Sequence, residues 1–129
     1  MRLINRYVYT AVAKSPSLTV PSAKETLRTL EGDCNEHTAL FTALARASGI
    51  PTRIAAGFVY SDRIAAGGAF YYHAWPEVWL GDGWLPVDPT FGQVPADATH
   101  VKLVEGGLDR QVDLVAAIGR VSLRVEESE

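Results

Sequence analysis

The chain has 129 residues, of which 47% are hydrophobic and 21% charged, and its formal net charge is −3. These values are typical of one globular domain and exclude a disordered or collagen-like protein. No apolar stretch approaches the ~20 residues that a transmembrane helix needs, and the N-terminus lacks the features of a signal peptide. The single cysteine excludes an internal disulfide, so the fold must be stabilised by packing.

Charge is distributed unevenly along the chain. Residues 1–30 carry five Lys or Arg and one Glu, whereas the remainder carries seven Lys or Arg and fourteen Asp or Glu. No basic stripe with interleaved aromatic residues is present, which argues against a nucleic-acid partner. We interpret the asymmetry as solvated helix faces and acidic loops.

The first part of the chain is predicted to be helical. Apolar residues recur at helical spacing over residues 3–12, and a Ser- and Pro-containing segment then breaks the pattern. Ser22 and Glu25 form the sequence pattern of a capping box, which predicts a short helix that ends near Gly32.

The next helix is predicted over residues 34–48, with Gly49 as its left-handed cap and Pro51 as its stop. This segment is apolar over much of its surface, which is typical of a helix buried in the middle of a domain. We therefore expect it to be the central helix of the fold.

After Pro51 the pattern changes to that of strands. The 61–69 segment contains Gly67 and Gly68, and we predict a loop there that opens and closes over a cleft. Helices first and strands later favour an α+β fold with an antiparallel sheet packed on the central helix. Strands are expected over residues 52–60, 70–80, 84–91, 98–107 and 119–127.

The only cysteine, Cys34, opens the central helix. A helix N-terminus carries about half a positive charge and presents free N–H groups, which favour a thiolate and can hold an oxyanion. The neighbouring Asp33 and Glu36 oppose ionisation, so the site needs a cationic partner. With that partner, we predict that the pKa of Cys34 falls well below the ~8.5 of a free thiol.

His73 is the candidate partner. Strand alternation places His73, Trp75 and Glu77 on one face, and Asp88 on the returning strand can accept the second ring proton of His73. A cysteine, a histidine and an orienting acid form a thiol triad, in which the base is itself held in place.

The hairpin register leaves one geometric question. A tight turn at Asp82 and Gly83 makes His73 and Asp88 diagonal neighbours, unless a bulge near Pro76 shifts the pairing by one residue. Because Pro76 has no N–H to donate, we expect it at an edge position or a bulge.

Three stretches in this order resemble the transglutaminase-like core domain of bacterial proteins, a superfamily with the papain-like cysteine proteinase fold. They are GDCNEHTALFTALARASGIPTRIAAGFVY, YHAWPEVWLGDGWLPVDPTFGQ and DATHVKL, and the resemblance covers roughly residues 3 to 106. It implies that Cys34 is the nucleophile, His73 the general base and acid, and Asp88 the orienting group. It also implies the Cys34 backbone N–H as one oxyanion donor. Pro76 departs from the family pattern.

The resemblance implies an enzyme that forms a thioester on Cys34 and passes the acyl group to water or to an amine. A non-catalytic interaction module with the same fold is the alternative. A zinc site built from Cys34, His37, His73 and Asp88 is a third hypothesis, although the second tight ligand cluster typical of zinc sites is missing. We assign His100 a structural role.

The expectations for organisation and partners follow from these patterns. We expect a single domain over residues 1–129, in the form of a C-terminal fragment of a longer protein, with no cofactor and no metal. The expected partner is a protein or peptide substrate, and acidic residues around the motif favour a cationic portion in it. The chain alone indicates a cytoplasmic location by default, and the resemblance also allows an exported parent protein.

Overall fold

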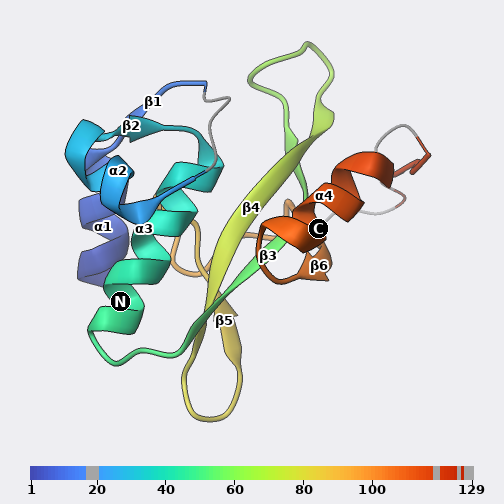
Figure 1. The fold of residues 1–129 in the computed structure, drawn as a ribbon. Helices are drawn as coiled ribbons and strands as arrows, with labels where there is room; N and C mark the ends of the chain where they lie inside the picture. The colour runs from blue at the N-terminus through green and yellow to red at the C-terminus, as the bar shows by residue number, and fades with distance from the viewer. Residues whose placement is uncertain (17–20, 118–119, 125, 127–129) are drawn as a thin grey trace.

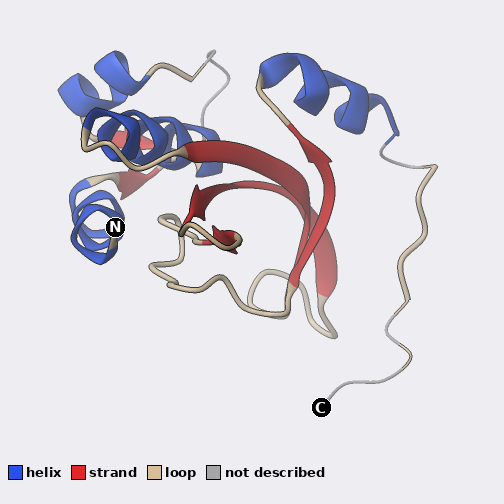
Figure 2. Cartoon of the chain, turned by 90° about the horizontal axis from the view of Figure 1, so that it is seen from below, coloured by secondary structure: helices blue, strands red, loops and turns tan. Residues whose placement is uncertain are grey.

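The computed structural model describes residues 1–16, 21–117, 120–124 and 126 (Figure 1). Helices α1–α3 gather on one side of an antiparallel sheet and α4 lies apart from them (Figures 1 and 2), which confirms the predicted α+β class. No helix among the described residues is long and apolar enough to cross a membrane. The elements in chain order are α1 (Arg2–Ala11), β1 (Ala13–Lys14), α2 (Ala23–Thr29), β2 (Glu31–Gly32), α3 (Cys34–Ala47), β3 (Thr52–Ser61), β4 (Ala69–Trp79), β5 (Trp84–Pro86), β6 (His100–Glu105) and α4 (Leu108–Ala117).

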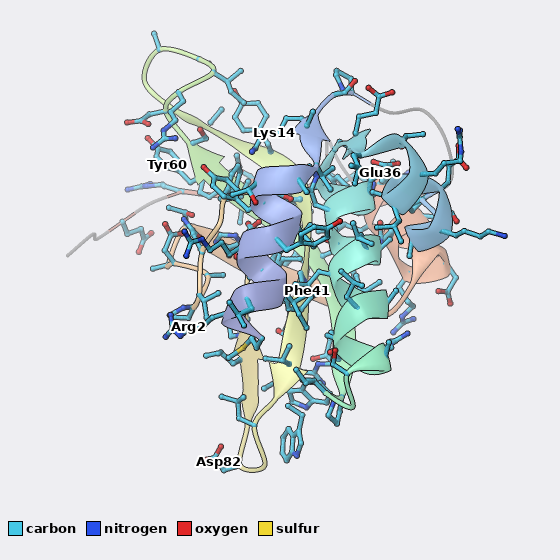
Figure 3. All side chains as sticks on the ribbon, turned by 90° about the vertical axis from the view of Figure 1, so that its left-hand side faces the viewer. Arg2, Lys14, Glu36, Phe41, Tyr60 and Asp82 are labelled. Carbon is cyan, nitrogen blue, oxygen red and sulfur yellow. The ribbon has the colours of Figure 1, made fainter. Side chains whose placement is uncertain are left out.

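The three predicted helices of the first half are present, and α3 is central among them. The Ser22 side chain accepts from the Glu25 N–H at the start of α2, as the capping pattern predicts. Phe41 of α3 is fully buried against Val8 of α1, and these two helices lie side by side (Figure 3). The apolar surface of α3 therefore packs on both α1 and the sheet.

The main sheet has the strand order β5-β4-β3-β6. In the β4–β5 hairpin Trp79 pairs with Trp84, and the Leu80 N–H donates to the Gly83 carbonyl at 3.0 Å. The tight turn is thus centred on Gly81 and Asp82, one residue earlier than the turn at Asp82 and Gly83 that the sequence analysis assumed. Gly81 has a φ of 97°, which favours glycine at this position of the turn.

The expectation for Pro76 was wrong. Pro76 lies in β4, an interior strand, and pairs with Ile54 in a continuous register without a bulge. Its carbonyl accepts from the Val87 N–H at 3.0 Å, so the missing N–H faces the β5 side. Strand β5 ends at Pro86, so the β4–β5 ladder has already ended beside Pro76. The missing N–H of Pro76 therefore removes no hydrogen bond from within that ladder.

The C-terminal region also differs from the prediction. The strand over residues 98–107 is confirmed as β6, but residues 120–124 of the expected last strand form no strand, and residues 119, 125 and 127 lie outside the described residues. Helix α4 was not predicted. The helical spacing of Val112 and Val115 was the available signal, but both are exposed, and the helix is anchored by Leu114, which is 4% exposed.

A β-bulge between β3 and β6 depends on Gly57. The register shifts between Ala56 and Gly57, and a Cβ added at Gly57 would overlap the carbonyl oxygen of Val101. We expect Gly57→Ala to destabilise the fold by at least about 2 kcal/mol, because backbone atoms cannot move aside as a side chain can. Thermal unfolding measures this, with Gly83→Ala as the matched control, since a Cβ there meets nothing within 4 Å. Equal melting temperatures for the two variants would contradict the prediction.

Candidate active site

Cys34 is the first residue of α3, and a capping box fixes the backbone around it. Asp33 Oδ1 accepts from the Asn35 N–H at 2.9 Å, and Glu36 Oε2 accepts from the Asp33 N–H at 2.9 Å. Any side chain at Gly32 would overlap the Cβ of Glu36, so the turn before the helix requires glycine. The sequence Gly-Asp-Cys-Asn-Glu therefore encodes a rigid helix start with the thiol at its opening.

The start of α3 docks against the backbone of β4 next to His73. The Thr38 hydroxyl donates to the Ala74 carbonyl at 3.1 Å, and the Cys34 thiol also has a hydrogen bond with the Ala74 backbone. The half-buried Cys34 packs against a small apolar cluster that includes Ala74 and Leu114 of α4. The thiol is thereby held within one residue of the candidate base.

The predicted low pKa of Cys34 was wrong. Burial, followed by the carboxylates of Asp33, Asp88 and Glu36, raises the pKa of this thiol to about 12, against the lowering effect of the Ala74 backbone. The sequence analysis counted the helix dipole and a cationic partner but not the apolar packing against α4. In the resting structure the thiol is therefore protonated at neutral pH.

His73 and Asp88 are in direct contact, as the sequence analysis predicted for this pair. Both are buried, and the His73 Nε2–H donates to Asp88 Oδ2 at 2.7 Å. Because an ionised carboxylate only accepts, the proton sits on Nε2 and His73 Nδ1 keeps a lone pair. Among the described residues, no hydrogen bond joins the Cys34 thiol to His73.

The hairpin register explains this contact without a bulge. With the Val87 N–H bonded to the Pro76 carbonyl, Asp88 comes opposite Trp75 and shares its face of the sheet with His73, diagonally across. The Phe91 ring stacks on His73 with centroids 4.9 Å apart and 17° between planes, and it closes one side of the base.

Four donors surround the Asp88 carboxylate. Oδ1 accepts from the N–H groups of Thr90 and Phe91 at 2.8 and 3.0 Å, and Oδ2 accepts from the ring nitrogens of His73 and His100, both at 2.7 Å. Burial raises the pKa of Asp88, but these hydrogen bonds outweigh it and hold that pKa at about 2. Asp88 is thus fully ionised despite being completely buried.

His100 is the residue that the sequence analysis missed. It was assigned a structural role, yet its Nε2 shares Asp88 Oδ2 with His73, and its ring contacts Trp75 edge-on with centroids 5.0 Å apart. The available signal was the alternation of side chains along β6. This alternation places His100 on the same face of the sheet as His73, once the pairing of β6 with β3 is known. That pairing is long-range and contains the Gly57 bulge, so sequence spacing could not provide it.

The residues proposed for a zinc site are not gathered in one place. His37 is fully buried, and its two ring nitrogens face the carbonyls of Asp33 and Val12 at 2.6 and 3.2 Å. It ties the end of α1 to the start of α3. Among the described residues, the group of possible ligands that lie within 4.8 Å of one another is His73, Asp88 and His100, where both rings are already bonded to the carboxylate.

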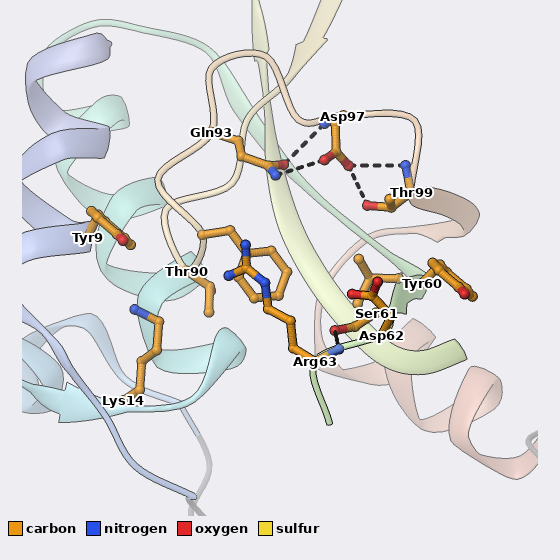
Figure 4. Close-up of a pocket in the computed structure, with 12 residues that line it drawn as sticks. Tyr9, Lys14, Tyr60, Ser61, Asp62, Arg63, Thr90, Gln93, Asp97 and Thr99 are labelled. Atoms are coloured by element: carbon orange, nitrogen blue, oxygen red, sulfur yellow. Dashed lines mark hydrogen bonds between the residues drawn. The ribbon is translucent and has the colours of Figure 1, made fainter. Parts of the chain in front are cut away.

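A pocket of about 540 Å³ lies beside this site, between the end of α1, the 61–63 segment and the loop after Asp88 (Figure 4). Arg63 and Lys14 approach it from different sides, and the exposed face of Phe91 lines it, so the aromatic ring separates the pocket from His73. The opening and closing of the 61–69 loop over a cleft stays a prediction.

The expected acidic character of the site is reduced in the structure. The buried Glu77 is bound by Arg53 at 2.7 Å and by Lys102 at 2.9 Å, and Asp82 lies at the far tip of the hairpin (Figure 3). Neither carboxylate is placed to attract a cationic substrate.

Comparisons with known proteins identify the family of this chain. The family model of the transglutaminase-like superfamily matches residues 1–89, which include Cys34, His73 and Asp88 but not His100. A protein-glutamine gamma-glutamyltransferase of Pseudomonas aeruginosa is 34% identical over 88 residues, which are 64% of this chain. The chain spans only 12% of the length of that relative.

Solved structures show the same fold. A putative cysteine protease from Cytophaga hutchinsonii is 26% identical with a TM-score of 0.68, over 81% of this chain and 34% of that one. The periplasmic domain of TgpA from P. aeruginosa, bound to ethylmercury, is 29% identical with a TM-score of 0.53, over 72% of this chain and 37% of that one. The family model covers more than half of the chain, and so the chain belongs to the transglutaminase-like superfamily, whose members include cysteine-dependent enzymes.

Proposed function

We propose that this domain transfers acyl groups from amides or peptide bonds through a thioester on Cys34. The observation that carries the proposal is the His73–Asp88 hydrogen bond, which fixes the His73 proton on Nε2 and leaves Nδ1 as a base. The first turn of α3 brings the Cys34 thiol to the neighbouring Ala74. The three residues have the roles of a thiol triad: nucleophile, base and orienting acid.

In the first half of the reaction, the Cys34 proton moves to His73 Nδ1 as Sγ bonds to the amide carbonyl carbon. The carbonyl oxygen becomes an oxyanion, for which the Cys34 backbone N–H is one donor, because the next N–H groups of α3 are bound by the Asp33 cap. The tetrahedral intermediate collapses when the C–N bond breaks and His73 returns its proton to the leaving amine. A thioester on Cys34 and a neutral His73 result.

In the second half, a water or an amine attacks the thioester carbon and gives its proton to His73. The C–S bond breaks, and Cys34 recovers its proton from the imidazolium. Water gives amidase or peptidase activity, and an amine gives transglutaminase activity. We favour hydrolysis on superfamily resemblance, with a protein or peptide as the expected substrate.

A non-catalytic interaction module is the second candidate. The raised pKa of Cys34 and its packing against Leu114 of α4 favour it, because both lower the reactivity of the resting thiol.

Similarity to a periplasmic domain agrees with the expectation of an exported parent protein, which stays part of the proposal.

Intact-mass analysis after mixing with glutamine-containing peptides and acyl-enzyme-forming esters tests the proposal. We expect a covalent acyl adduct on wild-type protein and none on Cys34→Ala. Addition of a primary amine should divert product to the amide if transamidation occurs, and should leave the acid as sole product if water is the acceptor. A folded wild-type protein that gives no adduct with any donor would support the interaction module instead.

A further inference from the structure

Two imidazoles share a single carboxylate oxygen in this domain. The Nε2 atoms of His73 and His100 both lie 2.7 Å from Asp88 Oδ2, and all three side chains are at most 5% exposed. A thiol triad needs only one imidazole on its orienting acid. The second ring therefore has to be explained by something other than the minimal triad.

Both ring nitrogens of His100 face hydrogen-bond acceptors. Nε2 faces the Asp88 carboxylate, while Nδ1 faces the Asp97 carbonyl at 3.1 Å and Asp97 Oδ1 at 3.2 Å. The nearby Thr99 hydroxyl gives its proton to Asp97 Oδ1, so it is no donor to the ring. A histidine that donates from both nitrogens is an imidazolium with a full positive charge.

Asp97 is itself held firmly in this arrangement. Its carboxylate accepts from the Gln93 side chain at 2.9 Å and from the Thr99 N–H at 3.1 Å, and its own N–H donates to Gln93 Oε1 at 3.1 Å (Figure 4). The His100 ring is thus fixed between two carboxylates. Both of them raise the pKa of His100 against the lowering effect of burial.

A positive charge on His100 disfavours a second positive charge on His73, although both rings are bound to Asp88. The two rings are 5.6 Å apart, so a second proton on His73 would place like charges at that distance across one carboxylate. We infer that His100 is a positioning residue of the candidate site, whose charge holds Asp88 in place and keeps His73 neutral until substrate is bound. This rests on the proposed function for its catalytic meaning, but the protonation pattern can be measured without substrate.

The remaining charged and titratable groups around the two rings come from several elements. Lys14 and Arg63 line the pocket on the other side of the Phe91 ring. His73 contacts Trp75 and Phe91 on its faces, and both are uncharged. On the side of α3 the nearest titratable groups are Cys34 and the acids Asp33 and Glu36 of its cap. The Glu77 carboxylate on β4 is neutralised by Arg53 and Lys102.

The test is the pH dependence of Cys34 alkylation by iodoacetamide, in the presence of EDTA, in wild type and His100→Gln. Glutamine keeps an N–H donor for Asp88 but has no charge, so the His73 imidazolium and Cys34 thiolate should form more easily. At an effective dielectric constant of about 20, removal of a like charge at this distance is expected to raise the rate at pH 7, relative to that at pH 10, on the order of a hundredfold. The ratio cancels any general increase in thiol exposure, which a purely structural role would produce.

Two matched variants complete the experiment. Asp97→Asn should move the ratio in the same direction by less, since it weakens the charge on His100 without removing the ring. Asp82→Asn, which makes the same charge change at the hairpin tip, should leave it unchanged. An unchanged or lower ratio in folded His100→Gln would overturn the inference.

If His100→Gln does not fold, nitrogen NMR of the wild-type histidine rings gives the same decision. Protons on both His100 nitrogens at pH 7, with His73 carrying one on Nε2, are expected, and a neutral His100 would overturn the inference. Neither measurement uses a substrate, so a failure to find turnover leaves both results intact.

Discussion

The Cys34 thiol of the folded chain should react with iodoacetamide at pH 7 about a hundredfold more slowly than the same thiol in the unfolded chain. A pKa of about 12 lies more than three units above the ~8.5 of a free thiol, which lowers the thiolate fraction more than a thousandfold. The remaining thiolate is more nucleophilic because it is more basic, and this recovers part of the loss. The sign follows from burial and from three nearby carboxylates, which all disfavour the anion.

The chain provides its own control, because Cys34 is its only cysteine. Rates measured with and without a denaturing concentration of urea compare one thiol in two environments. A folded rate faster than the unfolded one would show that a thiolate–imidazolium pair exists in the resting state and would contradict the protonated thiol described here.

Asp88→Asn should reduce thioester formation about as severely as Asp88→Ala, by up to about 10⁴. In a triad whose imidazolium appears only during the reaction, the acid both orients the base and stabilises that charge, and its loss has an effect of this size. A protonated resting Cys34 puts this domain in that class.

The hydrogen bonds of Asp88 make asparagine a poor replacement. All four of its partners are donors, so the NH₂ group of the introduced asparagine would have to face either two backbone N–H groups or two ring N–H groups. The ring of His73 would escape this only by moving its proton to Nδ1, which removes the base from Cys34. A buried unsatisfied donor also costs about 1–3 kcal/mol of stability.

Single-turnover acylation with an activated ester measures the effect, after circular dichroism has confirmed that both variants are folded. An Asp88→Asn variant that keeps more than a tenth of the wild-type acylation rate would mean that the charge of Asp88 is dispensable. No loss in either variant would remove Asp88 from the mechanism.

The residues with chemical roles could be proposed from sequence because their signals are local. Cys34 lies at a helix start with its own capping pattern, and His73 and Asp88 lie on two segments joined by a short turn. The α+β class followed in the same way from periodicity. What the sequence did not reveal depends on contacts between distant segments. The burial that raises the Cys34 pKa comes partly from α4, and the position of His100 depends on the β3–β6 register.

The short turn between β4 and β5 has a consequence for how this domain can vary. Side chains alternate between the two faces of a strand, so one residue added to or removed from segment 80–83 would turn Asp88 towards the opposite face, away from His73. The side chain of Asp82 at its tip is free to change, since it lies far from the site, whereas Gly81 with its φ of 97° requires glycine. An insertion or deletion of an even number of residues keeps Asp88 on the same face of the sheet as His73. An odd number places the two side chains on opposite faces, although both residues are still present in the sequence. The length of an exposed turn is therefore under the same constraint as the buried carboxylate that it orients.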